Sequence, residues 1–215
     1  MNSTQYIISG ILVLVVIAIL VGLYYYFNKY SVKGKMTRDF LPMIHDAKLA
    51  KRVNQGAIPS SSQGNEYNIN FWIYINDYVY RYNEDKVVIS RGVNPGIILT
   101  SETNSLKVIT EVENNLETSE DEEDDETNNE CVVEDFPLQR WVSVNVSLNN
   151  KVLDIFIDGK LKKTCVLNGY PKPNIGGMDI CPNGGFNGFM SNVRFTNSAL
   201  SLKEINSLYR NGPSL

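Results

Sequence analysis

Residues 66–76, which read EYNINFWIYIN, alternate apolar and polar side chains with a period of two. On an extended chain one side carries Tyr67, Ile69, Phe71, Ile73 and Ile75, and the other carries Asn68, Asn70, Trp72, Tyr74 and Asn76. A strand places successive side chains on opposite faces, whereas a helix does not. This stretch therefore predicts a β-strand with one fully buried face.

Further short apolar segments follow, separated by turn residues. We predict strands at 86–91, 96–100, 106–112, 141–148, 152–157, 160–167, 178–181 and 186–195. The pairs Asn149-Asn150 and Asp158-Gly159 tolerate the positive φ of tight hairpin turns and join residues 141–167 into an antiparallel meander. The pattern predicts an all-β fold, a two-sheet antiparallel jelly-roll sandwich.

The C-terminal segment combines glycines with an alternating strand. Gly184, Gly185 and Gly188 precede or enter the strand at 186–195 and suit tight turns and close backbone approach. A short helix, LKEINSLYR, is expected after Ser201, which is a good N-cap, and before Gly212 and Pro213. The segment is therefore interpreted as scaffold.

An uncharged apolar run extends from Tyr6 to Phe27. As a helix it is long enough to cross a hydrocarbon layer of about 30 Å, and we predict a transmembrane anchor there. Tyr24, Tyr25 and Tyr26 suit the headgroup level, and basic residues follow at Lys29, Lys33, Lys35 and Arg38. A cleaved signal peptide is the alternative, but the run has no basic n-region and no A-x-A site. The expected order is a tail at 1–5, the span at 6–27, a basic juxtamembrane segment and linker at 28–64, and the sandwich at 65–215.

The charge distribution bears on partners and topology. The net charge of −4 combines a basic cluster near the N-terminus with an acidic run, which disfavours nucleic-acid binding. Residues 1–5 carry no charged side chain, so the positive flank after residue 27 predicts a lumenal N-terminus and a cytosolic β domain. The sequon Asn145-Val146-Ser147 is expected on an exposed face, where it reports on this topology.

The acidic run, residues 117–130, lies in a loop expected at about 115–130. Such a charged segment predicts a solvated insertion, with divalent-cation binding or docking to a basic partner as alternatives. It lacks the ligand spacing of an EF-hand, so calcium has no identifiable site and no cofactor is expected. Of three cysteines, Cys131, Cys165 and Cys181, the odd count favours free packed thiols; one bridge between an unidentified pair is the alternative. His45 is the single histidine and receives no role.

Several motifs carry a family resemblance. They are INFWIYIND, ISRG, PLQRWVSVNVSL, LDIFIDGKLKKTC and GGFNGFMSNVRFTNSALSLKEINSLY. Together they resemble the laminin G-like, concanavalin A-like lectin/glucanase superfamily over about residues 65–212, and more narrowly its membrane-anchored members from large DNA viruses. The resemblance implies a jelly roll and a location in a viral inner membrane or virion. With a cytosolic β domain, the sandwich would face the capsid there, so we expect a capsid component as protein partner. Fold alone does not establish function.

Catalysis is not expected. Glucanase members of the superfamily carry carboxylates at alternate strand positions, whereas Glu134 and Asp135 are adjacent and point to opposite faces of a strand. Two functions remain: a non-catalytic membrane-anchored structural or interaction protein, which we prefer, and a glycan-binding lectin. For the lectin the candidate contacts are Trp72, Asn76, Asp77 and Tyr78.

Overall fold

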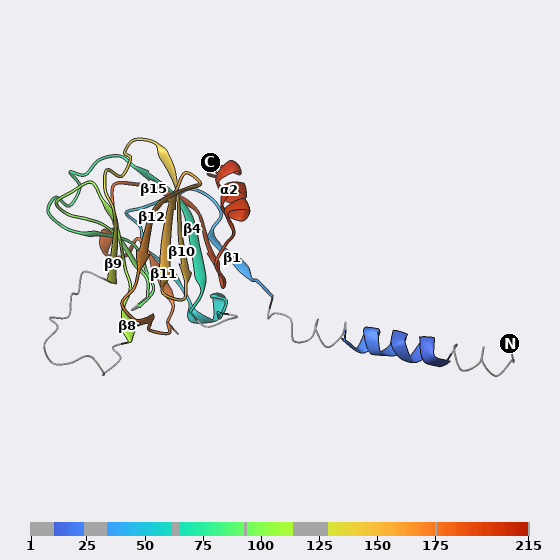
Figure 1. Ribbon diagram of the computed structural model, residues 1–215. Coiled ribbons are helices and arrows are strands. Elements are labelled where there is room, and N and C mark those ends of the chain that lie inside the picture. Colours follow the sequence, from blue (N-terminus) through green and yellow to red (C-terminus); the bar gives the residue numbers. More distant parts are fainter. Residues whose placement is uncertain are drawn as a thin grey trace, which may run out of the picture. The chain divides into compact units, whose positions relative to one another are not determined.

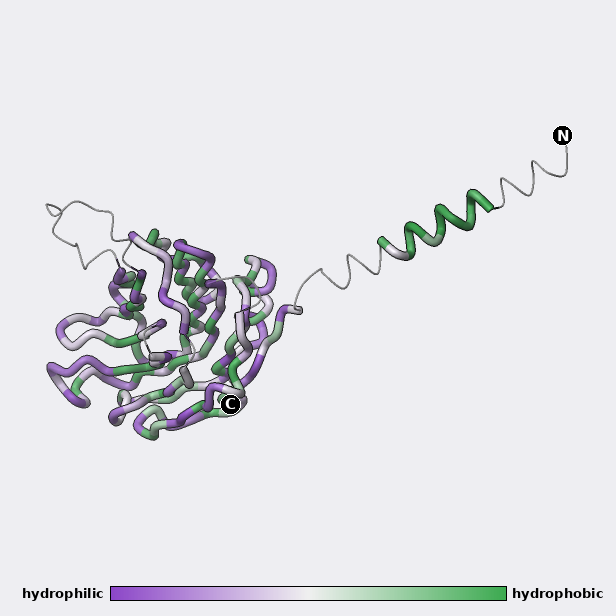
Figure 2. Tube along the Cα trace, turned by 90° about the horizontal axis from the view of Figure 1, so that it is seen from below, coloured by the Kyte–Doolittle hydropathy of each residue, from purple (hydrophilic) through white to green (hydrophobic). Residues whose placement is uncertain are grey.

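The computed structural model describes residues 11–23, 34–61, 65–92, 94–113, 129–174 and 176–214. The chain forms two compact units, Met1–Lys35 and Met36–Leu215. In the first unit, residues 11–23 form a helix, which Figure 2 colours almost entirely as hydrophobic. No helix among the described residues is both long and apolar enough to cross a membrane. The rest of the predicted span and most of the acidic loop lie outside the described residues.

The second unit is a sandwich of two antiparallel sheets (Figure 1). The first sheet has the order β1 (Thr37–Leu41), β15 (Gly188–Thr196), β4 (Tyr67–Ile75), β10 (Trp141–Asn149), β11 (Val152–Ile157) and β12 (Lys160–Val166), with β2 (His45–Asp46) also paired to β15. The second sheet has the order β3 (Lys51–Val53), β14 (Met178–Ile180), β5 (Lys86–Ser90), β6 (Gly96–Leu99), β7 (Leu106–Ile109) and β9 (Glu130–Val133). A small ribbon pairs β8 (Val112–Glu113) with β13 (Tyr170–Pro171).

The core fills the space between the two sheets. Phe71 of β4 lies opposite Val144 of β10, and both side chains are completely buried. Ile89 and Ile97 contribute from the second sheet. The alternation at 66–76 thus does produce one fully buried face, and the predicted two-sheet antiparallel sandwich is confirmed.

The strand boundaries agree with the sequence in the meander and differ at the N-terminal side. The predicted strand at 152–157 is β11, and Asp158 and Gly159 both take positive φ in the turn to β12. The prediction that the sandwich starts at residue 65 is wrong, because β1, β2 and β3 lie within 37–53 and pair with both sheets. The predicted strand at 106–112 is divided: β7 ends at Ile109, and Val112 then pairs with β13.

The glycines of the C-terminal segment have the predicted role. Gly184 and Gly185 adopt positive φ values of 81° and 44° in the turn before β15. At Gly188 a Cβ atom would lie only 2.0 Å from the Tyr74 carbonyl oxygen of the neighbouring strand. The approach of β15 to β4 therefore requires a residue without a side chain at this position.

The helix α2 (Leu202–Arg210) covers part of the outer face of the first sheet (Figure 1). Its predicted N-cap is confirmed: the Glu204 amide donates to the Ser201 hydroxyl, and the Glu204 carboxylate accepts in return from the Ser201 amide. Tyr209 stacks on Trp72 of β4 with ring centroids 5.8 Å apart. An outward-pointing position on this sheet is therefore not necessarily exposed.

Asn145 illustrates that burial. Only 2% of its surface is exposed, and it exchanges two amide hydrogen bonds with Asn68 at 2.7 and 3.1 Å. The expectation of an exposed sequon is wrong, because Asn145 does lie opposite the valine face but is covered there. It cannot serve as a glycosylation reporter of topology in the folded chain.

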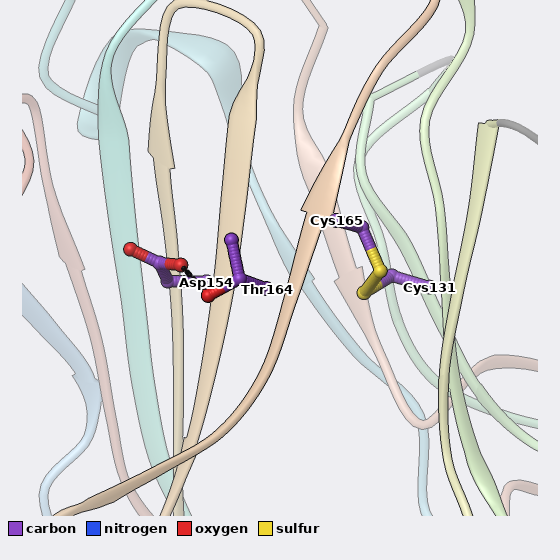
Figure 3. The surroundings of a disulfide bond; sticks show 4 residues. All are labelled: Cys131, Asp154, Thr164 and Cys165. Carbon is purple, nitrogen blue, oxygen red and sulfur yellow. Dashed lines mark hydrogen bonds between the residues drawn. A yellow bond between two sulfur atoms is a disulfide. The ribbon is translucent and has the colours of Figure 1, made fainter.

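A disulfide joins the edges of the two sheets. Cys131 of β9 and Cys165 of β12 are bonded, with Cα atoms 5.9 Å apart (Figure 3). The preference for three free thiols is wrong for this pair, because the inner faces of the two edge strands bring their sulfur atoms together. Cys181 is free and buried, and burial raises the pKa of its thiol to about 12.

Candidate functional site

Three aromatic side chains form a row across the outer face of the first sheet. Trp141 of β10 pairs in register with Tyr74 of β4, and Tyr74 pairs in register with Phe189 of β15. Directly opposite residues of antiparallel strands point to the same face, so the three rings are neighbours. The Trp141 and Tyr74 ring centroids are 5.7 Å apart in an edge-to-face arrangement. We call these three residues the aromatic row.

The aromatic row borders a surface hollow of about 290 Å³ that also includes Ile44 and Asn76. Phe189 is 39% exposed and Ile44 is 44% exposed, while Tyr74 and Trp141 are half-buried. Large apolar side chains tend to be buried in a soluble sandwich, so a group of them at the surface marks a surface suited to recognition.

Amide groups border one end of the aromatic row. The Asn76 side chain donates to the Asn187 side-chain oxygen at 3.3 Å, and the Gln139 side chain donates to the Asn76 carbonyl at 3.4 Å. Asn187 in turn donates to the Asp77 carboxylate. Apolar rings next to fixed amide donors and acceptors can hold a ligand that has both a C–H face and hydroxyl groups.

The carboxylate of Asp77 is held by its own turn. It accepts hydrogen bonds from the Val79 and Tyr80 amides at 3.0 and 3.1 Å. These hydrogen bonds lower the pKa of Asp77 below its ordinary value of 3.8, and the bond from the Tyr80 amide has the largest effect. Asp77 therefore stays ionised well into the acidic range and fixes the turn beside the amide groups.

The predicted glycan contacts separate into two groups. Asn76 lines the hollow, and Asp77 supports the amide network beside it. Trp72 is only 6% exposed beneath Tyr209 of α2, and Tyr78 packs against the core with its hydroxyl buried. Trp72 and Tyr78 are therefore not available as a surface platform, whereas Tyr74, Trp141 and Phe189 line the hollow.

The alternation along each strand, which decides the face on which a residue lies, is the sequence signal for Tyr74 and Trp141, the residues that the prediction missed. Tyr74 has the same parity as Trp72 in β4, and Trp141 has the same parity as Ser143 and Asn145 in β10. The alternation would therefore have placed Trp141 on the outer face. It did not indicate which part of that face α2 covers, and this decides which aromatic residues remain accessible.

The family assignment rests on a match over most of the sandwich. The family model described as "Concanavalin A-like lectin/glucanases superfamily" matches residues 52–206. The chain belongs to this superfamily. A comparison with curated proteins finds no match.

Solved structures with this superfamily's fold include binding domains of botulinum neurotoxins. The serotype D ligand binding domain in complex with N-acetylneuraminic acid has a TM-score of 0.58 and 12% identity, over 83% of this chain and 46% of that chain. The serotype D binding domain has a TM-score of 0.57 and 13% identity, over 83% of this chain and 46% of that chain. The mosaic C/D receptor binding domain has a TM-score of 0.53 and 10% identity, over 83% and 47%. The chain thus matches less than half of each neurotoxin domain, and identities this low show the fold alone.

The structure places the adjacent acids Glu134 and Asp135 after the edge strand β9. Both residues are exposed. Within the described residues, no group of three or more His, Cys, Asp or Glu side chains could hold a metal ion. The acidic segment, which was the alternative cation site, lies mostly outside the described residues.

Proposed function

We propose that the sandwich is a non-catalytic recognition module that binds a glycan at the aromatic row. The observation that carries this proposal is the row of Trp141, Tyr74 and Phe189 along a surface hollow, bordered by the amide groups of Asn76 and Asn187. Aromatic faces pack against the C–H face of a sugar ring, and amides bond its hydroxyl groups. Membership in a superfamily that contains lectins supports this proposal.

The neurotoxin structure adds limited support. Its printed ligand, N-acetylneuraminic acid, is an acidic sugar bound to that protein. Because this chain corresponds to less than half of that domain, the ligand's position does not transfer to it. The proposal for this chain therefore stands on its own aromatic row and amide groups.

A second candidate is protein docking at the same surface. Ile44 in the hollow and Met43, which precedes it in the sequence, are 44% and 70% exposed, and both are apolar and unsuited to a sugar's hydroxyl groups. A membrane-anchored form of the chain could then present the sandwich to a protein such as a capsid component. In this arrangement residues 6–27 are the proposed anchor, in a viral inner membrane or virion.

A glycan array separates the two candidates. The full chain is used in a detergent without a sugar headgroup, next to Trp141→Ala and the matched control Tyr82→Ala. Tyr82 is 73% exposed and lies outside the hollow. Binding that a free sugar competes, and that Trp141→Ala reduces at least about tenfold, is expected, since truncating an aromatic anchor costs about 2 kcal/mol or more. Absence of binding to every glycan would reject the lectin function.

A further inference from the structure

A second cavity, of about 250 Å³, opens at the other end of the β4–β10 strand pair. It is lined by Tyr67 and Leu148, which are paired in register, whereas the aromatic row begins at the Tyr74–Trp141 pair. At about 3.4 Å per residue these two pairs are about 24 Å apart. Tyr67 points to the inner face and Tyr74 to the outer face, so the cavity is separate from the aromatic row.

Arg91 reaches across this cavity from one sheet to the other. It follows β5 of the second sheet, and its guanidinium lies 4.7 Å from the ring centroid of Phe195 on β15 of the first sheet. The Tyr67 ring stacks on the same Phe195 ring, with the two centroids 6.0 Å apart. The cation is thus held against the Phe195 ring rather than extended into solvent.

The charge of Arg91 has little compensation within the protein. Its residue is 9% exposed, one Nη atom donates to the Asn174 carbonyl at 3.3 Å, and its Nε is buried without a hydrogen-bond partner. In the part of the chain that the structure describes, no carboxylate forms an ion pair with it. Burial lowers the pKa of Arg91. A buried cation without a counter-ion is unfavourable, so an anion that enters the cavity is stabilised.

Other polar groups around Arg91 also lack partners. The Tyr67 hydroxyl is buried beside the Thr110 side chain, which can donate to its oxygen, so that the Tyr67 O–H itself has no acceptor. The Asn94 side-chain oxygen is buried without a hydrogen bond, although the Asn94 amide nitrogen donates to the carbonyls of Glu111 and Lys172, at 3.1 Å each. Buried polar groups are normally paired in a native structure. The Asn94 oxygen and the Arg91 Nε thus leave hydrogen-bonding capacity unused in two residues that line the cavity.

The residues that line the cavity restrict the charge and polarity of a ligand that could bind there. Leu148, Pro171, Pro173 and Phe195 are apolar, and Ser60 and Ser61 supply hydroxyl groups at its border. Lys172 lines it but already pairs with Glu111 at 3.2 Å, and Glu66 adds a negative charge. One uncompensated cation beside one acid favours a singly charged anion over a doubly charged phosphate. A guanidinium matches the planar oxygens of a carboxylate.

We propose that this cavity binds a small carboxylate ligand, with Arg91 as its cationic anchor and Tyr67 as a hydrogen-bond donor. The apolar walls and border hydroxyls fit the ring of an acidic monosaccharide. The site is independent of the aromatic row.

Calorimetric titration of the full chain, in a detergent without a sugar headgroup, tests this proposal. D-Glucuronate and D-glucose are matched probes, since they differ in the carboxylate. Glucuronate is expected to bind at least about tenfold more tightly than glucose. Equal affinities, or no heat of binding with glucuronate, would overturn the proposal. Inorganic phosphate binding more tightly than glucuronate would overturn the carboxylate assignment.

Two variants locate the bound probe. Arg91→Met removes the charge at similar volume and is expected to weaken glucuronate binding at least about tenfold, and Tyr67→Phe about fivefold, the effect of one hydrogen bond. Unchanged affinity in a folded Arg91→Met would overturn the site. If Arg91→Met does not fold, Tyr67→Phe decides, because it retains the ring packed on Phe195.

Trp141→Ala separates this inference from the proposed function. It is expected to bind glucuronate with unchanged affinity because it alters only the aromatic row. Loss of glucuronate binding in Trp141→Ala would place the ligand at the aromatic row and overturn the inference while supporting the proposed function. Binding that depends on Arg91 without any hit on the glycan array would support the inference alone.

Discussion

At the scale of single residues, Gly188 positions the strand that carries Phe189. A methyl group there would lie 2.0 Å from the Tyr74 carbonyl oxygen and 2.9 Å from the Phe186 ring. Gly188→Ala is expected to lower the free energy of unfolding by about 2 kcal/mol, because the strands must separate to accept it. Chemical denaturation measures this loss. Gly56→Ala is the control, since a Cβ at Gly56 meets nothing within 4 Å; equal stability of the two variants would contradict the account.

Asp77 predicts a pH dependence of stability. Its folded pKa is lowered below 3.8, chiefly by the Tyr80 amide. A carboxyl whose pKa is lower in the folded chain than in the unfolded chain stabilises the fold fully at a pH above the unfolded pKa. This stabilisation is lost as the pH falls through the folded pKa. The difference in the free energy of unfolding between the native chain and Asp77→Ala should therefore be constant above about pH 5. It should become smaller as the pH falls below the ordinary pKa of an aspartate.

Thermal melts at several pH values measure that difference. Glu102→Ala, at an exposed acid, is the control and should remain within about 0.5 kcal/mol of the native chain. A stability difference for Asp77→Ala that widened toward acidic pH would have the wrong sign and would contradict the assigned hydrogen bonds.

At the scale of elements, the disulfide ties β9 to β12, the two edge strands on one side of the sandwich. It closes a loop with a sequence separation of 34 residues. Replacing both Cys131 and Cys165 by Ala is expected to lower the free energy of unfolding by about 3 kcal/mol, largely because the unfolded chain gains freedom. Chemical denaturation measures the loss.

Thiol titration of the denatured chain provides the check on this pairing. One reactive thiol, Cys181, is expected without reductant and three after reduction. Three thiols before reduction, in protein purified under oxidising conditions, would show that the bridge does not form.

The elements also show how far the sequence determines the fold. Period-two alternation located β4, β10 and β11, because one face of each is fully buried. It missed β1 and β3, whose residues are mostly exposed and whose strand character comes from pairing with β15 and β14. In the candidate site, Asn76 was predicted and lines the hollow. Trp72 was predicted and Trp141 was not, because the position of α2, which covers Trp72, cannot be read from the alternation.

At the scale of the whole molecule, two features give opposite indications of where the sandwich resides. Basic residues after the apolar run, including Lys35 and Arg38, predict a cytosolic β domain. The Cys131–Cys165 disulfide is typical of lumenal or extracellular proteins. The prediction from charge is that protease added to sealed microsomes digests the sandwich. Protection from protease would contradict it and agree with the disulfide.

The central claim is that the aromatic row contacts a glycan, and tryptophan fluorescence tests it most directly. The chain has two tryptophans, Trp72 beneath α2 and Trp141 in the row. In Trp72→Phe the emission therefore reports on Trp141 alone. Titration with a glycan that binds on the array should shift this emission and saturate at the affinity measured for the native chain. Saturable binding of that glycan with no change in Trp141 emission would contradict the claim.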